Sequence, residues 1–170
     1  LKERGSTAFL LLNNREQLSI LRILQSGQVV SGRNCWARVL RTGKFKTACM
    51  SVNLLTQLDR ESASMNALVP FVLRRGTAGY PDMAAISARL DDMYGAAVEP
   101  VVRRIGEIQC LGFYASFPEG SLLPDKAGVM PGVCEMLAEL LLRPNTRGGL
   151  FLPAYVDSER AKLVDVIRGR

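Results

Sequence analysis

The sequence predicts an α+β fold in which helices pack on one face of an antiparallel sheet. Strand-like stretches occur in two groups, amphipathic helical patterns follow each group, and strands and helices do not alternate strictly. The length of 170 residues suits one domain, and chains of this size bury roughly 70% of the surface that they expose when unfolded. The composition, 48% hydrophobic and 22% charged, is that of a folded globular protein.

The first group of strands follows a segment of unclear role, residues 1–27. Residues 28–31, 34–41 and 47–58 are strand-like, with a turn signal at Gly32. Consecutive short strands joined by tight turns favour antiparallel pairing. We therefore expect one domain over residues 28–170.

The N-terminal segment offers weaker signals. The apolar run at residues 18–24 is compatible with a short helix. Lys2 and Arg4 precede the apolar residues 8–12 and so mimic a signal peptide, but that apolar stretch is too short. We interpret it as an ordinary segment of the chain.

Two helices are predicted next. Asp59 can cap the first, which ends at Gly76, and Pro81 begins the second, which ends at Gly95. Pro70 falls inside the first pattern and predicts a kink or a break, because proline lacks an amide donor; the cost is ~3 kcal/mol. The first helix has apolar residues at i, i+3, i+4, i+7 and i+8 spacing, namely Met65, Leu68, Val69, Val72 and Leu73.

The second group of strands covers residues 96–104 and 107–117, joined by a turn at Gly106. Further helices are predicted over residues 131–142 and 153–168. The sequence ends while the last helical pattern continues. We therefore expect the domain to be incomplete at its C-terminus and the chain to be an N-terminal piece of a longer one.

Composition excludes several kinds of chemistry. The sequence has no histidine, so it can form no histidine-based zinc site and use no histidine base. Its four cysteines form no CxxC pair, which favours buried free thiols and a reducing cytoplasm. No apolar stretch approaches the roughly 20 residues of a membrane-spanning helix. The net charge of +6 comes from scattered residues rather than a basic run.

Three blocks of sequence resemble the pitrilysin-like M16 peptidases, and especially their non-catalytic members. They are residues 68–77, which end in Arg-Arg-Gly-Thr, residues 80–82 and residues 90–96. Active members carry HxxEH on a helix: two histidines at i and i+4 hold zinc and the glutamate activates water. The resemblance places the two ligand positions at Ala67 and Phe71 and the base position at Pro70. None of these side chains can perform those tasks.

The same resemblance places the family's third zinc ligand, a glutamate on a later helix, at Glu159. One carboxylate alone holds zinc poorly, so we expect no metal and no other cofactor. We assign Glu159 a structural role as a surface or helix-pairing residue, facing Lys162 at i+3 spacing.

The resemblance also implies a peptide-binding edge strand, on which active relatives lay an extended peptide. Its predicted residues are Val98, Glu99, Val101, Val102 and Arg103. An edge strand that binds nothing, protected by its charges and by Pro100, is the alternative.

The expected function is therefore that of a catalytically inactive zinc-peptidase-like domain. It would bind a peptide, or it would serve as a partner subunit or lid half for an active M16 peptidase. That active partner would be a separate subunit or a second half of the same chain. A homo-oligomer is a further alternative. A non-metal enzyme is one alternative, with Ser87 or Ser158 beside Lys162, or with the carboxylates Glu135 and Glu139. Nucleic-acid binding through net charge is the other, without any recognisable motif.

Overall fold

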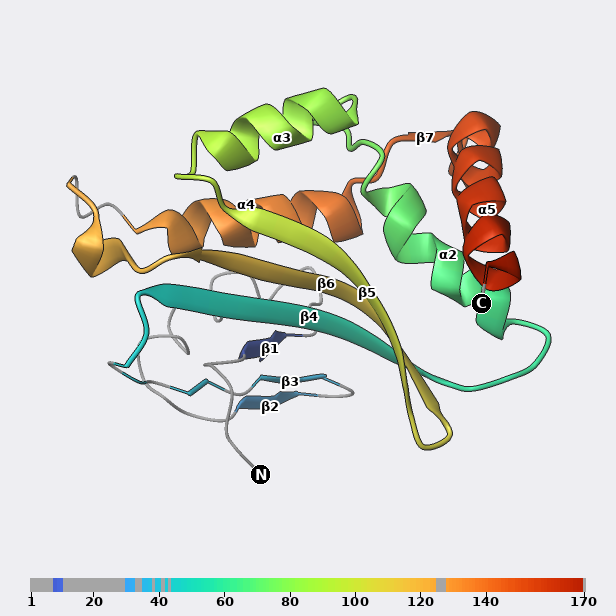
Figure 1. Ribbon diagram of the computed structural model, residues 1–170, viewed down its shortest axis with the longest axis horizontal. Coiled ribbons are helices and arrows are strands. Elements are labelled where there is room, and N and C mark those ends of the chain that lie inside the picture. The colour runs from blue at the N-terminus through green and yellow to red at the C-terminus, as the bar shows by residue number, and fades with distance from the viewer. Residues whose placement is uncertain are drawn as a thin grey trace.

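A computed structural model describes residues 8–10, 30–32, 35–37, 39–40, 42, 44–124 and 128–169. Its main sheet has the strand order β1-β4-β6-β5, formed by β1 (Ala8–Leu10), β4 (Thr47–Gln57), β6 (Ile108–Pro118) and β5 (Ala97–Ile105) (Figure 1). The β4–β6 and β6–β5 pairs are antiparallel, whereas β1 pairs with β4 in parallel. The strand β5 is thus an edge of the sheet within the described residues.

Four α-helices lie in the described part of the chain: α2 (Ala63–Leu73), α3 (Met83–Asp91), α4 (Val129–Leu142) and α5 (Pro153–Arg168). All four lie on the same side of the main sheet, with α2 beside α5 (Figure 1). The fold is α+β, as the sequence predicts.

The core lies between α3, α4 and the helix-facing side of the sheet. The register pairs Val52 with Phe113 and Met50 with Ala115, so alternate residues of both strands point toward the helices. Phe113 and Ala115 are fully buried. The helical side of the same cluster contains Ile86, Leu90, Val133, Met136, Leu137 and Leu140.

The first predicted helix differs from expectation at two points. Asp59 accepts the backbone N–H of Ser62 at 3.0 Å, but it forms a turn ahead of the helix, and the regular helix begins at Ala63. The helix continues through Pro70 instead of breaking there. Pro70 is buried, and its carbonyl still accepts the N–H of Arg74 at 3.2 Å, so packing outweighs the single missing backbone bond.

Smaller elements complete the fold. The first two predicted strands correspond to the short antiparallel pair β2 (Val30–Gly32) and β3 (Cys35–Ala37). A hairpin of β7 (Thr146–Arg147) and β8 (Leu150–Phe151), a 3-10 turn at Gly120–Leu122 and the parallel strand β1 were not predicted. The helix proposed for residues 18–24 lies outside the described residues. No helix of the described part has the length and apolar character needed to cross a membrane.

Candidate functional site

The helix α2 carries the three degenerate motif positions. Ala67 is half-buried, Pro70 is fully buried and Phe71 is 36% exposed. The helix docks on β6 through Gln109, whose amide donates to the Ala63 carbonyl at 2.8 Å and accepts from Asn66 at 3.3 Å. These three side chains offer no lone pair for a metal and no group that could take a proton from water.

The loop after α2 fixes how the chain turns toward α3. The N–H of Thr77 donates to the Tyr80 carbonyl at 2.6 Å, and the buried Thr77 hydroxyl accepts the Tyr80 N–H at 2.9 Å. A Cβ on Gly76 would lie 2.6 Å from the carbonyl oxygen of Pro81, which only glycine avoids. The Gly-Thr pair is therefore required by local geometry.

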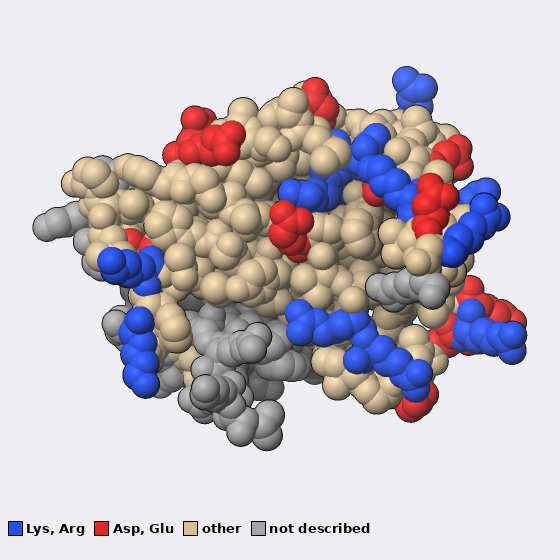
Figure 2. Space-filling view, viewed as in Figure 1, with Lys and Arg blue, Asp and Glu red and all other residues tan. Residues whose placement is uncertain are grey.

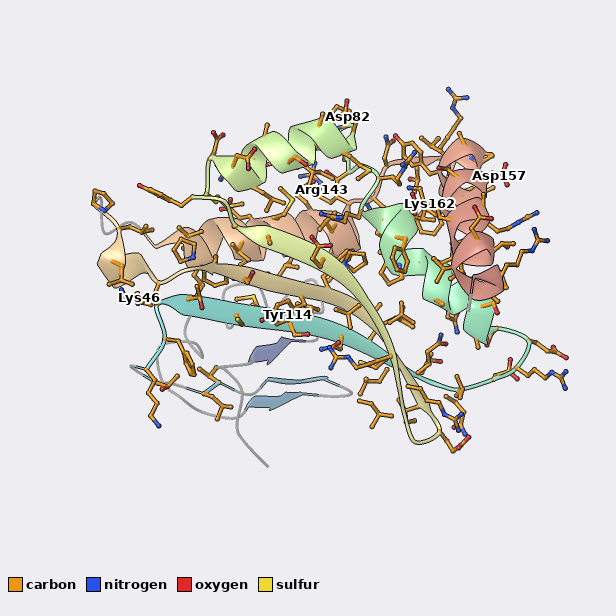
Figure 3. All side chains as sticks on the ribbon, in the orientation of Figure 1. Lys46, Asp82, Tyr114, Arg143, Asp157 and Lys162 are labelled. Atoms are coloured by element: carbon orange, nitrogen blue, oxygen red, sulfur yellow. The ribbon has the colours of Figure 1, made fainter. Side chains whose placement is uncertain are left out.

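Glu159 lies on α5 against the end of α2, with a relative exposure of only 7%. Its Oε1 is 2.7 Å from Lys162 Nζ, which confirms the pairing expected from their spacing, and 3.3 Å from Arg75 Nη1. Lys162 projects from α5 on the side of α2 (Figure 3). Glu159 is thus a buried helix-pairing residue rather than a surface one, and its carboxylate is occupied by two cations.

Arg75 and Tyr155 are the residues of this cluster that the sequence interpretation missed. The guanidinium carbon of Arg75 also lies 5.5 Å from the ring centroid of Tyr155, a distance suited to a cation–π contact. The Tyr155 hydroxyl donates to the Pro81 carbonyl at 3.3 Å, which connects α5 to the loop before α3. We call Arg75, Tyr155, Glu159 and Lys162 the α2–α5 junction.

The edge strand β5 contains all five predicted peptide-binding residues. Val101 is half-buried, while Glu99, Val102 and Arg103 are exposed. Val98 is 1% exposed and belongs to the core, so only its backbone can meet a ligand. Arg74 Nη2 lies 3.3 Å from Glu99 Oε1 and connects the end of α2 to this strand.

The hairpin turn determines which backbone groups of β5 point outward. Ile105 and Ile108 flank the two-residue turn and form a hydrogen-bonded pair, as such turns require, and Gly106 has φ 60°. Because bonded and non-bonded pairs alternate, the groups of Val102 and Pro100 face away from β6. Pro100 therefore removes a donor from the free edge and none from the β5–β6 ladder.

Two residues of the alternative enzyme hypotheses, Glu139 and Lys162, have other partners. Glu139 pairs with Arg143 at 2.6 Å and accepts the Gly79 N–H at 3.3 Å, whereas Glu135 is exposed on α4. Lys162 contacts Glu159 rather than a serine. Within the described ranges, no three His, Cys, Asp or Glu residues are grouped so that they could hold a metal ion.

Comparison with known proteins gives one curated relative. The chain is 32% identical over 127 residues to a protein of Bacillus subtilis (strain 168) named "Probable inactive metalloprotease YmfF", a match that covers 75% of this chain and 30% of that protein. The sequence is thus similar to part of an inactive metalloprotease. No family model matches the chain.

A solved structure has the same fold. The crystal structure of a conserved protein from Enterococcus faecalis V583 superposes with a TM-score of 0.71 at 23% identity, over 75% of this chain and 30% of that one. The chain therefore spans about 30% of the length of both proteins.

Proposed function

We propose that the chain is a catalytically inactive domain of the pitrilysin-like M16 type that binds an extended peptide along β5. The observation that carries this proposal is the free edge of β5 beside α2, in which Ala67, Pro70 and Phe71 stand where an active member would have two ligands and a base. The similarity to a protein named as an inactive metalloprotease supports it.

The α2–α5 junction supports the loss of metal chemistry. A carboxylate at the third ligand position would have to face a cation, and here Glu159 faces Arg75 and Lys162 within 3.3 Å. Their positive charges compensate the buried carboxylate, so the cluster is stable without a metal. The domain keeps the two-helix arrangement and uses it for packing.

The bound peptide belongs to a substrate or to a partner. In this proposal the domain acts beside an active M16-type subunit, or beside a second half of the same polypeptide, and presents an extended segment to it. Strand addition supplies affinity through main-chain hydrogen bonds, which need no catalytic group.

Peptide titration tests the proposal. The probe is a fluorescein-labelled peptide of about eight alternating valines and threonines, long enough to span most of β5 at roughly 3.3 Å per residue. Val102→Pro removes an outward donor while leaving the ladder to β6 intact, so it should abolish the rise in fluorescence anisotropy. The control Val102→Ala keeps that N–H and should bind normally.

Two further measurements bear on inactivity. Zinc content and peptidase activity of the purified chain should both be at background. Stoichiometric zinc with chelator-sensitive cleavage would overturn the proposal, and so would equal peptide binding by Val102→Pro and Val102→Ala with unchanged circular dichroism.

A further inference from the structure

We infer that the extended segment bound at β5 is acidic, with a carboxylate opposite Arg103. This inference rests on the proposed strand addition and adds the chemistry of the ligand. It follows from the charges around the edge, from the side to which each edge residue points, and from the spacing of a strand that would pair there.

The charges around the β5 edge do not balance. On the helix side, where α2 contacts β5 and α5 contacts α2, Arg75 and Lys162 share the single carboxylate of Glu159. Arg74 is matched by Glu99. On the visible face, Lys and Arg side chains lie over α2, α5 and the β5–β6 hairpin, with Asp and Glu side chains among them (Figure 2).

The hairpin end has the same excess. Arg104 is engaged by Glu107 at 2.9 Å and by the Gly106 carbonyl at 2.7 Å. Arg103 is exposed and forms no ion pair with any described residue. Its charge is therefore available to a ligand.

The register of β5 gives Arg103 a favourable position. Arg103 forms a bonded pair with Cys110 on β6, so its own N–H and C=O point inward. With respect to a strand added antiparallel to β5, Arg103 is then a non-hydrogen-bonded position, where facing side chains approach most closely, with Cα atoms about 4.5 Å apart. A glutamate opposite Arg103 can reach its guanidinium.

Glu99, four residues before Arg103 on β5, does not favour a carboxylate opposite it. It lies on the same face of the sheet as Arg103 by strand alternation and carries the other sign of charge. At roughly 3.3 Å per residue, the two positions are about 13 Å apart. Because Glu99 is already paired with Arg74, an acidic residue opposite Glu99 gains no cation. The edge therefore favours a carboxylate at the position opposite Arg103.

Three peptides test this chemistry. They share the valine and threonine framework and carry two central glutamates, two glutamines or two lysines. The glutamate peptide should bind roughly twofold to fivefold more tightly than the glutamine peptide at low salt. The difference should disappear between about 0.1 M and about 1 M NaCl, as the Debye length falls from roughly 10 Å to 3 Å.

A matched pair of variants locates the effect. Arg103→Glu should reverse the preference in favour of the lysine peptide. Arg147→Glu changes the net charge equally at an exposed position on β7 and should leave the preference unchanged. An equal loss in both variants would mean general attraction by the net charge and would overturn the inference.

The remaining outcomes distinguish the acidic preference from the proposed peptide binding on which it rests. If all three peptides bind equally and Val102→Pro abolishes their binding, the strand-addition site stands and its acidic preference is wrong. If no peptide binds, both proposals fail together.

Discussion

The α2–α5 junction and the β5 edge lie close together and handle charge in opposite ways. In the junction, the Glu159 side chain is 8% exposed and pairs with two cations, Arg75 and Lys162. The Arg75 guanidinium also lies over the Tyr155 ring. Along the edge, Arg103 is exposed without an ion pair among the described residues, and backbone groups point away from the sheet. The difference indicates that the junction holds the helices together, whereas the edge is the place where we propose that a peptide binds.

Removal of Glu159 should have the largest effect on the junction. Truncating one member of a buried ion pair leaves uncompensated charge, which costs several kcal/mol when both partners are buried. Because Lys162 is 59% exposed and can regain water, we expect Glu159→Ala to lower the free energy of unfolding by about 2 kcal/mol. Urea denaturation of Glu159→Ala and of the unchanged chain measures this difference in the free energy of unfolding.

A control for this variant exists on α4. Glu135 is exposed, so Glu135→Ala should change the free energy of unfolding by less than about 0.5 kcal/mol. Peptide binding at β5 should be retained in folded Glu159→Ala. Equal urea midpoints for the two variants would contradict the stabilising role of Glu159 in the junction.

The two cations of the junction should not contribute equally. Arg75 is 26% exposed and combines its ion pair with the Tyr155 ring contact, so Arg75→Ala should cost about 1 to 2 kcal/mol. Lys162 is 59% exposed, its pair with Glu159 has i, i+3 spacing, and Arg75 still compensates Glu159 in its absence, so about 0.5 kcal/mol or less is expected for Lys162→Ala. A larger loss for Lys162→Ala in urea denaturation would contradict this ranking.

Sequence patterns predicted the parts of this molecule that depend on neighbours along the chain. Apolar periodicity located α2 to α5, and i+3 spacing predicted the contact between Glu159 and Lys162. The hairpin β7–β8 could also have been found, because Gly148 and Gly149 both have positive φ and a Gly-Gly pair is a strong turn signal.

The contacts that define the two regions depend on residues far apart in the chain. No local pattern relates Arg75 to Glu159, which meet only because α2 packs beside α5. In the same way, no local pattern predicts that β1 pairs with β4 in parallel. The edge position of β5 was predicted, but from the family resemblance and not from a local pattern. The charge excess around Arg103 likewise depends on contacts between elements, because Arg74 meets Glu99 and Arg75 meets Glu159 only in the folded chain.

The smallest effect concerns Tyr114, which pairs with Glu99 in the register and so lies directly inside the β5 edge. Its hydroxyl donates to Cys49 Sγ at 2.8 Å, and this bond, together with burial, raises the pKa of Tyr114 to about 12 (Figure 3). Because the pKa of the folded state exceeds the usual value near 10, any contribution to stability is complete below about pH 10 and is lost as the pH rises toward 12.

Tyrosinate absorbance at 295 nm measures this titration directly. One of the four tyrosines should ionise about two pH units late, and Tyr114→Phe should remove that late component. Cys49→Ala should lower the pKa of Tyr114, since the thiol bond is the largest cause of the shift. An acidic peptide that adds outside β5, as proposed, should leave the late component unchanged. Loss of that component on binding would show that the ligand reaches Tyr114, beyond the edge strand.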